Sequence, residues 1–243
     1  MNFYALIIGT EILNARREDK HFIFLRDELK KYGHELFASF IVKDDRKLIK
    51  DMFELIKKDK DAVMFSFGGI GSTPDDLTRA ISAEVFTLSP LIRHKQFEQD
   101  IVNRFGDEAY PYRIHMSDLP KDADLLKNPV NNMSGYSLFN KFFFVPGFPQ
   151  MAHPMIKEVI KNVFGKTKDK YRLTLLAKTS ENTLISVMKE IPSHIELSSL
   201  PILKDKDILV EISLASTDEK ELEKFFSLFT TSLKASNIAY NLI

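Results

Sequence analysis

The sequence predicts an α/β protein with a mostly parallel central sheet, followed by a small α+β domain. Apolar runs alternate with amphipathic helical patterns over residues 1–85, an order typical of a parallel sheet covered by helices on both faces. Past a polar segment at 165–170 the alternation restarts and runs over residues 170–243. The segment at 165–170 is therefore the expected linker between a first domain, 1–165, and a second, 170–243.

The expected elements follow from the apolar spacing. An unbroken apolar run at 3–8, ending at Gly9, predicts a strand buried on both faces. Apolar side chains then recur on one helical face over about 17–32, and Gly33 stands where a glycine commonly ends a helix. The rest of the first domain is expected in this order: strand 35–42, helix 46–58, strand 62–67, helices 77–84 and 90–105, a mostly irregular stretch 113–126, an edge hairpin 136–145 turning at Asn140-Lys141, and helix 149–164.

The second domain repeats the two patterns on a smaller scale. Its expected elements are strand 172–177, helix 181–189, strands 194–199 and 208–214, and helix 218–234. This order predicts a compact α+β unit.

Composition excludes several kinds of site and partner. The chain of 243 residues has no cysteine, so it forms no disulfide, thiolate zinc site or cysteine nucleophile. Its 34 basic residues balance 34 acidic ones, without the basic excess of a duplex-binding surface. No apolar run approaches the ~20 residues that span a bilayer, and the N-terminal residues lack a secretory pattern. We therefore expect a cytoplasmic protein with no nucleic-acid or membrane partner.

The loop after the third expected strand, residues 68–76, carries the strongest functional pattern. It reads GGIGSTPDD and holds three of the nine glycines in the chain. Glycine costs backbone entropy, so the cluster indicates close approach of backbone N–H groups to an anion at a helix start. Ser72 and Thr73 add hydroxyl donors. Asp75 and Asp76 would hold a hard cation such as Mg²⁺ that bridges to phosphate oxygens.

Helix capping is a second interpretation of the same residues. Thr73, Pro74 and one aspartate are also what a helix start requires. Capping does not account for three glycines, so we interpret the loop as a binding site that also caps its helix. Asp44 and Asp45 have two interpretations as well: ligands or catalytic groups, or the N-cap of the helix at 46–58.

Other strand-end loops are expected to share this site, because ligands of open α/β sheets bind beyond the carboxyl ends of the strands. These loops are Gly9-Thr10-Glu11, Asp44-Asp45, residues 68–76 and Pro146-Gly147-Phe148-Pro149. Glu11 could bind a metal or sugar hydroxyls, whereas the last loop could be only a rigid turn.

Familiar alternatives are missing from the sequence. It contains no Gly-x-x-x-x-Gly-Lys-Ser/Thr motif and no Gly-x-Gly-x-x-Gly after the first strand. The six histidines are scattered without paired spacing, so a histidine zinc site is not expected. His21 and His153 are expected to be surface or helix residues rather than catalytic groups.

Four segments resemble, in order and spacing, the competence/damage-inducible protein A family within the MoaB/Mog (molybdopterin-binding) superfamily. They are Gly9-Thr10-Glu11-Ile12-Leu13; the Gly-Gly-x-Gly…Asp-Asp-x-Thr signature from Gly68 to Thr78; Asn128-Pro129-Val130 with Ser134-Gly135-Tyr136; and Val145 to Met151. The resemblance covers about residues 3–160, and residues 195–201 are similar to part of a small α+β domain that follows in that family. The family's carboxyl-terminal amidase domain is expected to be absent.

The resemblance implies a three-layer α/β/α Mog-type fold that binds a nucleotide or pterin through pyrophosphate. It implies a divalent cation (Mg, Mn or Co) held by Asp75 and Asp76, with molybdopterin as a possible ligand. Asp76 and one of Asp44 and Asp45 match aspartates that serve molybdopterin adenylylation in the MoaB/Mog branch. The implied ligand-binding residues are Gly9, Thr10, Glu11, Gly68, Gly69, Gly71, Ser72, Thr73, Thr78, Ser134, Gly135, Pro146, Gly147 and Pro149. Because the family forms oligomers, we expect a homo-oligomer, with a dimer favoured.

The sequence departs from the family pattern at four positions. Ala15 replaces a common glycine, and His21 replaces a common asparagine. Phe148 and Met151 stand where a second proline and a glutamate are common. These departures concern the sugar or base side of the pocket more than the phosphate side.

Three functions are compatible with these residues. The leading hypothesis is a metal-dependent pyrophosphatase, and the resemblance to the competence-protein branch implies ADP-ribose-like substrates. Asp75 and Asp76 would bind the metal, and Asp44 or Asp45 would be a further ligand or the base that orients water. Molybdopterin binding or adenylylation shares nearly every residue, and a non-catalytic nucleotide-sensing or scaffold role is the third. RNA binding by the second domain is disfavoured, since no Gly-x-x-Gly loop follows Gly165.

Overall fold

The computed structural model describes residues 1–168, 170–204 and 207–243. Asp169, within the expected linker, lies outside the described residues. The chain forms two compact units, Met1–Thr167 and Lys168–Ile243, here the first and second units. No helix of the described residues is both long and apolar enough to cross a membrane.

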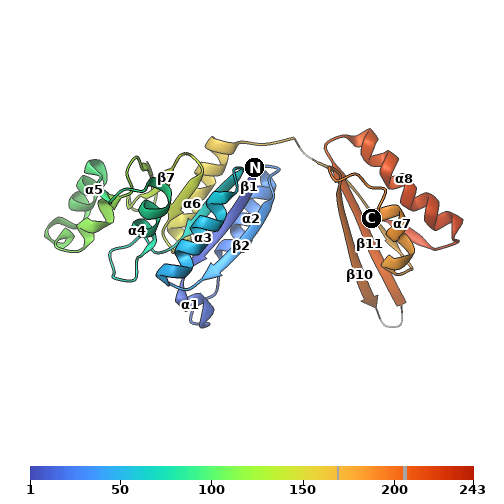
Figure 1. Ribbon diagram of the computed structural model, residues 1–243, viewed down its shortest axis with the longest axis horizontal. Helices are drawn as coiled ribbons and strands as arrows, with labels where there is room; N and C mark the ends of the chain where they lie inside the picture. The colour runs from blue at the N-terminus through green and yellow to red at the C-terminus, as the bar shows by residue number, and fades with distance from the viewer. Residues whose placement is uncertain (169, 205–206) are drawn as a thin grey trace. The chain divides into compact units, whose positions relative to one another are not determined.

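The first unit is built on a six-stranded sheet between two layers of helices (Figure 1). The strand order is β2-β1-β3-β8-β7-β6. The first four strands are parallel, and β7 pairs antiparallel with both β8 and β6. The strands are β1 (Asn2–Ile8), β2 (Leu36–Val42), β3 (Ala62–Phe67), β6 (Asp124–Leu126), β7 (Gly135–Leu138) and β8 (Phe142–Val145). The helices are α1 (Thr10–Leu13), α2 (His21–Lys31), α3 (Arg46–Lys58), α4 (Thr78–Ser82), α5 (Lys95–Phe105) and α6 (Pro149–Val159). The predicted, mostly parallel α/β sheet is confirmed.

Two apolar cores lie on opposite faces of this sheet. Alternate side chains of β1 divide between them, as strand geometry requires. Leu6 faces the core that α3 closes through Phe53, and Ile7 faces the core that α2 and α6 close through Leu25 and Ile156. Burial on both faces explains why the central strands read as unbroken apolar runs.

The end of α2 follows the expected glycine geometry. Gly33 has a φ of 76°. Its N–H donates to the carbonyl oxygen of Lys30, and that of His34 donates to Leu29, both at 3.0 Å. This pair of bonds is a Schellman motif, which satisfies carbonyls at the helix end.

Two expected helix starts were wrong. The helix predicted over 17–32 begins at His21, because the Asp19 carboxylate accepts its backbone N–H at 2.8 Å and so ends the preceding loop. The helix predicted over 90–105 begins only at Lys95. Residues 92–93 instead form β4 (Ile92–Arg93), which pairs with β5 (Asp118–Leu119).

The hairpin was predicted at the sheet edge, but it lies further in. β8 pairs with β3, and β6, within the stretch expected to be irregular, forms the edge beyond β7. The turn is centred one residue earlier than expected, on Phe139 and Asn140, which both have positive φ. Such a two-residue turn matches the twist of paired strands. At the carboxyl ends of α4 and α6, π-helical turns extend the helices over Ala83–Thr87 and Ile160–Phe164.

The second unit is a four-stranded antiparallel sheet with helices against one face. Its strand order is β10-β11-β9-β12. The elements are β9 (Tyr171–Ala177), α7 (Ile185–Met188), β10 (Glu196–Lys204), β11 (Asp207–Ser216), α8 (Glu219–Ala235) and β12 (Tyr240–Leu242). Leu175 and Ile212 of the sheet pack with Phe229 of α8 in its core. The expected helix at 181–189 is a 3₁₀ turn followed by the short α7, and β12 was not expected.

Candidate functional site

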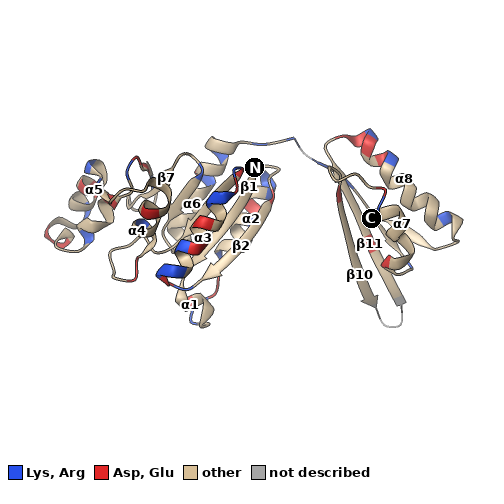
Figure 2. Ribbon diagram, viewed as in Figure 1, with Lys and Arg blue, Asp and Glu red and all other residues tan. Residues whose placement is uncertain are grey.

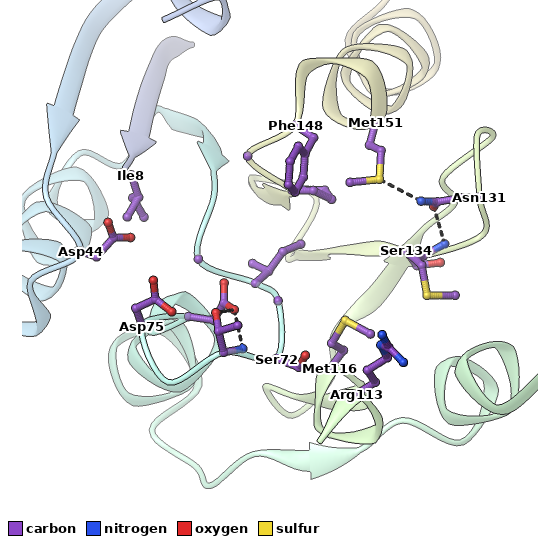
Figure 3. Close-up of a pocket in the computed structure, with 18 of the residues that line it drawn as sticks. Ile8, Asp44, Ser72, Asp75, Arg113, Met116, Asn131, Ser134, Phe148 and Met151 are labelled. Atoms are coloured by element: carbon purple, nitrogen blue, oxygen red, sulfur yellow. Dashed lines mark hydrogen bonds between the residues drawn. The ribbon is translucent and has the colours of Figure 1, made fainter. Parts of the chain in front are cut away.

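A pocket of about 750 Å³ opens in the first unit beside the carboxyl ends of β1, β3 and β8. Four loops line it, those after β1, β2, β3 and β8, as expected for an open α/β sheet. Figure 3 shows Asp44 and Asp75 on one side and Arg113, Asn131 and Met151 on the other. The pocket therefore has an acidic, loop-lined end and a second end rich in apolar side chains.

Backbone geometry fixes the first two glycines of the loop after β3. Gly68 and Gly69 have φ of 100° and 69°. A Cβ on Gly68 would lie 2.4 Å from the carbonyl oxygen of Ile8, and one on Gly69 would lie 2.3 Å from Thr78 Oγ1. The Thr78 hydroxyl donates to the Gly68 oxygen, and its N–H to that of Gly69, both at 3.0 Å. The glycines thus allow tight packing of the loop on β1 and α4.

Asp76 braces the tip of this loop. Its Oδ2 accepts the N–H of Thr73 at 2.8 Å and the hydroxyl at 2.5 Å. A Cβ on Gly71 would lie 2.5 Å from the same oxygen, so the third glycine makes room for the carboxylate. Asp76 therefore holds the loop's shape, in addition to any contact it makes with a ligand.

Arg79 supports the loop from behind and was not singled out from the sequence. The side chain is buried, and its Nη1 donates to the carbonyl oxygens of Ile70 and Gly71. Burial lowers the pKa of this guanidinium, while the charge of Asp76 acts in the opposite direction. Drawing two carbonyl oxygens inward toward Arg79 stabilises a loop conformation that leaves other backbone groups to the pocket.

Asp44 and Asp45, adjacent in sequence, have different roles. Asp44 lines the pocket, and its Oδ2 accepts the N–H and the hydroxyl of Thr10, both at 2.8 Å. Asp45 lies outside the pocket lining and accepts the N–H of Leu48 at 2.8 Å, as the N-cap of α3. Of the two interpretations given above, capping describes Asp45, and the site interpretation suits Asp44.

Basic side chains from the segment after α1 also reach the pocket. Arg16 and Arg17 line it, and Nη1 of Arg17 lies 3.5 Å from Oε1 of Glu11. The guanidinium of Arg17 stacks over Phe148, 5.4 Å from the ring centre. The sequence analysis did not identify these two arginines. Their position side by side, just after a strand-end loop, is the sequence signal that could have identified them.

The far end of the pocket is apolar with two polar groups. Three methionines and two phenylalanines line it: Met116, Met133, Met151, Phe97 and Phe105. Asn131 Nδ2 lies 2.9 Å from the sulfur of Met151 (Figure 3). The guanidinium of Arg113 lies over the Phe105 ring, 4.6 Å from its centre. Met151 belongs to the segment from Val145 to Met151 and was assigned to the sugar or base side of the pocket, which this position agrees with. The other residues follow no motif, and only the fold brings them to the pocket, so the sequence did not identify them.

The structure brings most of the expected site residues to the pocket. Those that line it are Glu11, Asp44, Gly69, Gly71, Ser72, Thr73, Asp75, Asp76, Ser134, Pro146 and Gly147. Those that do not are Gly9, Thr10, Asp45, Gly68, Thr78, Gly135 and Pro149. The second group mainly supports the first: Thr10 and Thr78 hold neighbours in place, Gly135 packs on the Phe144 carbonyl oxygen, and Pro149 begins α6.

His21 is buried behind the loop after β8. It is 3% exposed, stacks on Phe67 with ring centres 4.4 Å apart, and lies next to His153. Burial lowers the pKa of both imidazoles, that of His153 to about 4. Both rings are therefore neutral near pH 7 and act in packing and hydrogen bonding.

Three aspartates of the pocket, Asp44, Asp75 and Asp76, are the carboxylates that could hold a divalent cation. Among the described residues, no three histidine, aspartate or glutamate side chains gather into a complete metal site. The Asp75 side chain is exposed and makes no hydrogen bond within the described ranges. Asp44 and Asp76 each use Oδ2 in bracing the loops. Mg²⁺ commonly binds through one or two carboxylates plus substrate phosphates, which is the arrangement these side chains suit.

The fold and the pocket define a family. Residues 4–166 match the family described as the probable molybdopterin binding domain, and the chain belongs to it. The Mog-type fold expected from the resemblance is confirmed.

Within this family, the chain is similar in sequence to CinA-like and competence-damage inducible proteins. The chain is 30% identical over 161 residues to a CinA-like protein of Acaryochloris marina, covering 63% of this chain and 38% of that protein. It is 25% identical over 232 residues to a putative competence-damage inducible protein of Clostridium kluyveri, covering 91% of this chain and 56% of that protein. The chain thus spans about half or less of these relatives.

A solved structure of similar fold is the protein CinA of Thermoplasma acidophilum, described as having unknown function. It matches with a TM-score of 0.60 and 25% identity, over 67% of this chain and 99% of that one. The resemblance to competence/damage-inducible proteins is therefore confirmed.

Proposed function

We propose that the pocket binds a nucleotide or pterin through its pyrophosphate and that the protein hydrolyses ADP-ribose-like substrates with a divalent cation. The contrast between the pocket's two ends carries this proposal: a glycine loop with carboxylates at one end, and methionine and phenylalanine side chains at the other. Its volume, about 750 Å³, is in the range of roughly 300–1,000 Å³ usual for small-molecule sites.

Each group of residues has a part in this proposal. The backbone N–H groups of Gly71 and Ser72 and the Ser72 hydroxyl bind one phosphate, and Arg16 and Arg17 neutralise the other. The apolar end takes the planar ring, with Asn131 and Arg113 as polar contacts.

Hydrolysis then needs an oriented water. Asp44, held by Thr10, orients the water whose oxygen bonds to one phosphorus as the bridging P–O bond breaks. The products are two phosphate monoesters. Asp75 and Asp76 would hold a divalent cation, which would supply Lewis-acid charge neutralisation at the phosphates.

Molybdopterin binding or adenylylation is the second candidate. The family description favours it, and a pterin suits the apolar end as well as a nucleobase does. Oxidising the purified protein and measuring pterin fluorescence in the extract tests it directly. A non-catalytic nucleotide sensor is the third candidate, and it predicts binding without turnover.

The deciding experiment measures hydrolysis of ADP-ribose and related dinucleotides with Mg²⁺, Mn²⁺ or Co²⁺, beside calorimetric binding. Asp75→Asn is the sharpest variant, because its side chain supports no loop contact in the described structure. Asp76→Asn removes the same charge but also weakens the brace on Thr73. Asp45→Asn is the matched control, since asparagine caps a helix as well as aspartate does.

We expect turnover that Asp75→Asn and Asp76→Asn reduce at least about 100-fold, with Asp45→Asn at the wild-type rate. Binding without turnover under every metal would replace hydrolysis by the sensing role. Neither binding nor turnover with nucleotides, together with a bound pterin, would move the function to molybdopterin handling.

A further inference from the structure

The apolar end of the pocket has few polar side chains, and none of them is acidic. The acidic residues that line the pocket all come from the segments after β1, β2 and β3: Glu11, Asp44, Asp75 and Asp76. α5 and the turns after it carry charges of both signs (Figure 2), but of the charged side chains in the described segment 95–117, Arg113 alone lines the pocket. No carboxylate of the described residues is therefore placed to contact a ring bound at this end.

Asn131 lies in a loop whose own hydrogen bonds fix its position. The buried Asn128 side chain donates from Nδ2 to the carbonyl oxygen of Met133, and its Oδ1 accepts the N–H of Val130, both at 3.0 Å. The backbone oxygen of Asn131 accepts a hydrogen bond from Arg104 at 2.9 Å. Two carbonyl oxygens of the loop are thus already paired, and the loop holds the Asn131 side chain at the pocket.

The amide of Asn131 is oriented so that its NH₂ group lies on the pocket side. Its Oδ1 accepts the N–H of Met133 at 3.0 Å, a place that the amide nitrogen cannot take because it is itself a donor. Nδ2 therefore points the other way, to the sulfur of Met151, which also lines the pocket (Figure 3). A thioether is a weak acceptor, and the NH₂ group has two N–H bonds, so a donor is left for a ligand.

Arg113 adds further donors at the same end. Its Nη1 donates to the backbone and side-chain oxygens of Glu108 at 3.0 and 2.7 Å, and its guanidinium lies over the Phe105 ring. These contacts hold the guanidinium plane, while Nε and Nη2 have no partner in the described part of the chain. Figure 3 shows Arg113 and Asn131 on the same side of the pocket. The hydroxyl of Ser134, also at this end, can donate or accept and so favours neither kind of ligand edge.

Donors on the protein select acceptors on the ring. A 6-oxopurine, guanine or hypoxanthine, presents two adjacent acceptors, O6 and N7. Adenine presents N7 beside its N6 amine, which is a donor. Bound adenine would leave a donor of the protein facing that amine, and a donor left unpaired in a desolvated pocket is costly. The donor pair of Asn131 and Arg113 therefore matches an oxo ring and not an amino ring.

We propose that Asn131 and Arg113 select a ring that carries an oxo group beside a ring nitrogen, the 6-oxopurine of a nucleoside diphosphate, over adenine. This inference rests on the proposed function and deepens it: among ADP-ribose-like substrates, those with hypoxanthine or guanine in place of adenine bind best. The 4-oxo group and N5 of a pterin present the same pair of acceptors, so a pterin is the other source of this chemistry.

Calorimetric titration of the full chain with IDP and with ADP, each with Mg²⁺, measures the preference. The two ligands differ only in the oxo group or amine at position 6 and in the N1 proton that accompanies it. We expect IDP to bind at least about tenfold more tightly. Asn131→Asp keeps an oxygen for the N–H of Met133 but replaces the NH₂ group by an acceptor, so the ratio of the two affinities should fall at least about tenfold. The ratio cancels the repulsion that the new charge exerts on both diphosphates.

Asn132→Asp is the matched control. It adds the same charge one residue away, on an exposed side chain outside the pocket lining, at a φ of 58° that aspartate adopts as asparagine does. This variant should keep the wild-type ratio of affinities. Arg113→Met, on a partly exposed side chain, removes the other donors and should also lower the ratio. It keeps the test decisive if circular dichroism shows that Asn131→Asp does not fold.

The outcomes separate this inference from the proposed function. Equal affinities for IDP and ADP, or a wild-type ratio in both Asn131→Asp and Arg113→Met, would overturn the ring preference and leave nucleotide binding intact. Binding of neither nucleotide would contradict the proposed function instead. In that case binding of neopterin phosphate, followed by its fluorescence, lost in Asn131→Asp and kept in Asn132→Asp, would support the selection of an oxo ring and identify a pterin as its source. Failure of all three ligands to bind would overturn both proposals.

Discussion

His21 Nε2 lies 3.3 Å from the carbonyl oxygen of Gly147, joining α2 to the pocket loop after β8. On the other side of the ring, Nδ1 lies 3.3 Å from Nε2 of His153. Neutral rings satisfy both contacts when His21 donates to Gly147 and His153 donates to His21. A proton added to His21 occupies Nδ1 and removes the acceptor of the His153 N–H, and protonation of both rings sets two cations side by side. The pocket loop is therefore tied to the protonation state of a buried histidine pair.

Stability should decrease in mild acid because of this pair. Burial lowers the pKa of both imidazoles below the value of about 6.5 usual in an unfolded chain, and it lowers the pKa of His153 to about 4. A lowered pKa means that the unfolded state binds protons first as the pH falls. The contribution is therefore complete above about pH 6.5 and is lost progressively down to about pH 4.

Urea unfolding between pH 8 and pH 4 measures this loss. His153→Gln should reduce it by about 1 kcal/mol, allowing for solvent screening of the half-buried ring. The nearest groups that also titrate or carry charge are Asp19, Arg17 and Lys157, and the variant leaves all three in place. An acid loss identical in wild type and variant would contradict the assignment.

Gly69→Ala should destabilise the first unit far more than Gly106→Ala. Both residues have positive φ, 69° and 54°, so both substitutions carry backbone strain. A Cβ at Gly69 would also lie 2.3 Å from Thr78 Oγ1, whereas one at Gly106 meets nothing within 4 Å. We expect about 2 kcal/mol more loss at Gly69 in chemical unfolding. Equal losses of unfolding free energy in the two variants would show that the loop shifts to accommodate the new Cβ at no cost.

Arg79→Met should destabilise the glycine loop. The substitution keeps the buried volume but leaves the carbonyl oxygens of Ile70 and Gly71 without their donor. We expect a loss of about 2–4 kcal/mol in unfolding free energy, together with weaker nucleotide binding. Arg79→Lys keeps the charge and one donor and should recover part of both. Unchanged stability in Arg79→Met would refute this supporting role.

The sequence predicted the elements best where one local rule decided them. The helix at 46–58 and the strand at 62–67 have the predicted bounds, because apolar spacing and burial agree there. The helix expected from residue 90 failed because Ile92 pairs with Leu119, a contact between distant segments that no local pattern shows.

The site residues also differ in whether a local sequence pattern marks them. Loops 9–11 and 68–76 were identifiable because strand ends and glycines mark them. The glycines themselves have a reason the sequence did not show: Gly68 packs on a carbonyl oxygen of β1, and Gly71 makes room for Asp76. Arg79 and Met133 reach the site or its support through the fold alone.

Asp44 and Asp45 offer a final test, because disturbing Asp45 should lower stability, whereas disturbing Asp44 through Thr10 should mainly lower ligand affinity. Asp45→Ala removes the N-cap of α3 and should cost about 1 kcal/mol of stability, with ligand affinity unchanged. Thr10→Val keeps the shape of Thr10 but removes its hydroxyl bond to Asp44. Thr10→Val should weaken ligand binding about tenfold, because the Asp44 carboxylate then keeps only its bond from the N–H of Thr10. The loss of stability should be smaller than that of Asp45→Ala.

Calorimetric titration with ADP-ribose and Mg²⁺, beside urea unfolding of each variant, separates the two effects. Asp45→Asn, unlike Asp45→Ala, should keep the wild-type stability, since asparagine is an equally good N-cap. If Asp45→Ala weakened binding as much as Thr10→Val, then Asp45 would belong to the site after all. If Thr10→Val left affinity unchanged, the position of Asp44 would not depend on the threonine hydroxyl, and the water-orienting role assigned to Asp44 would lose its structural support.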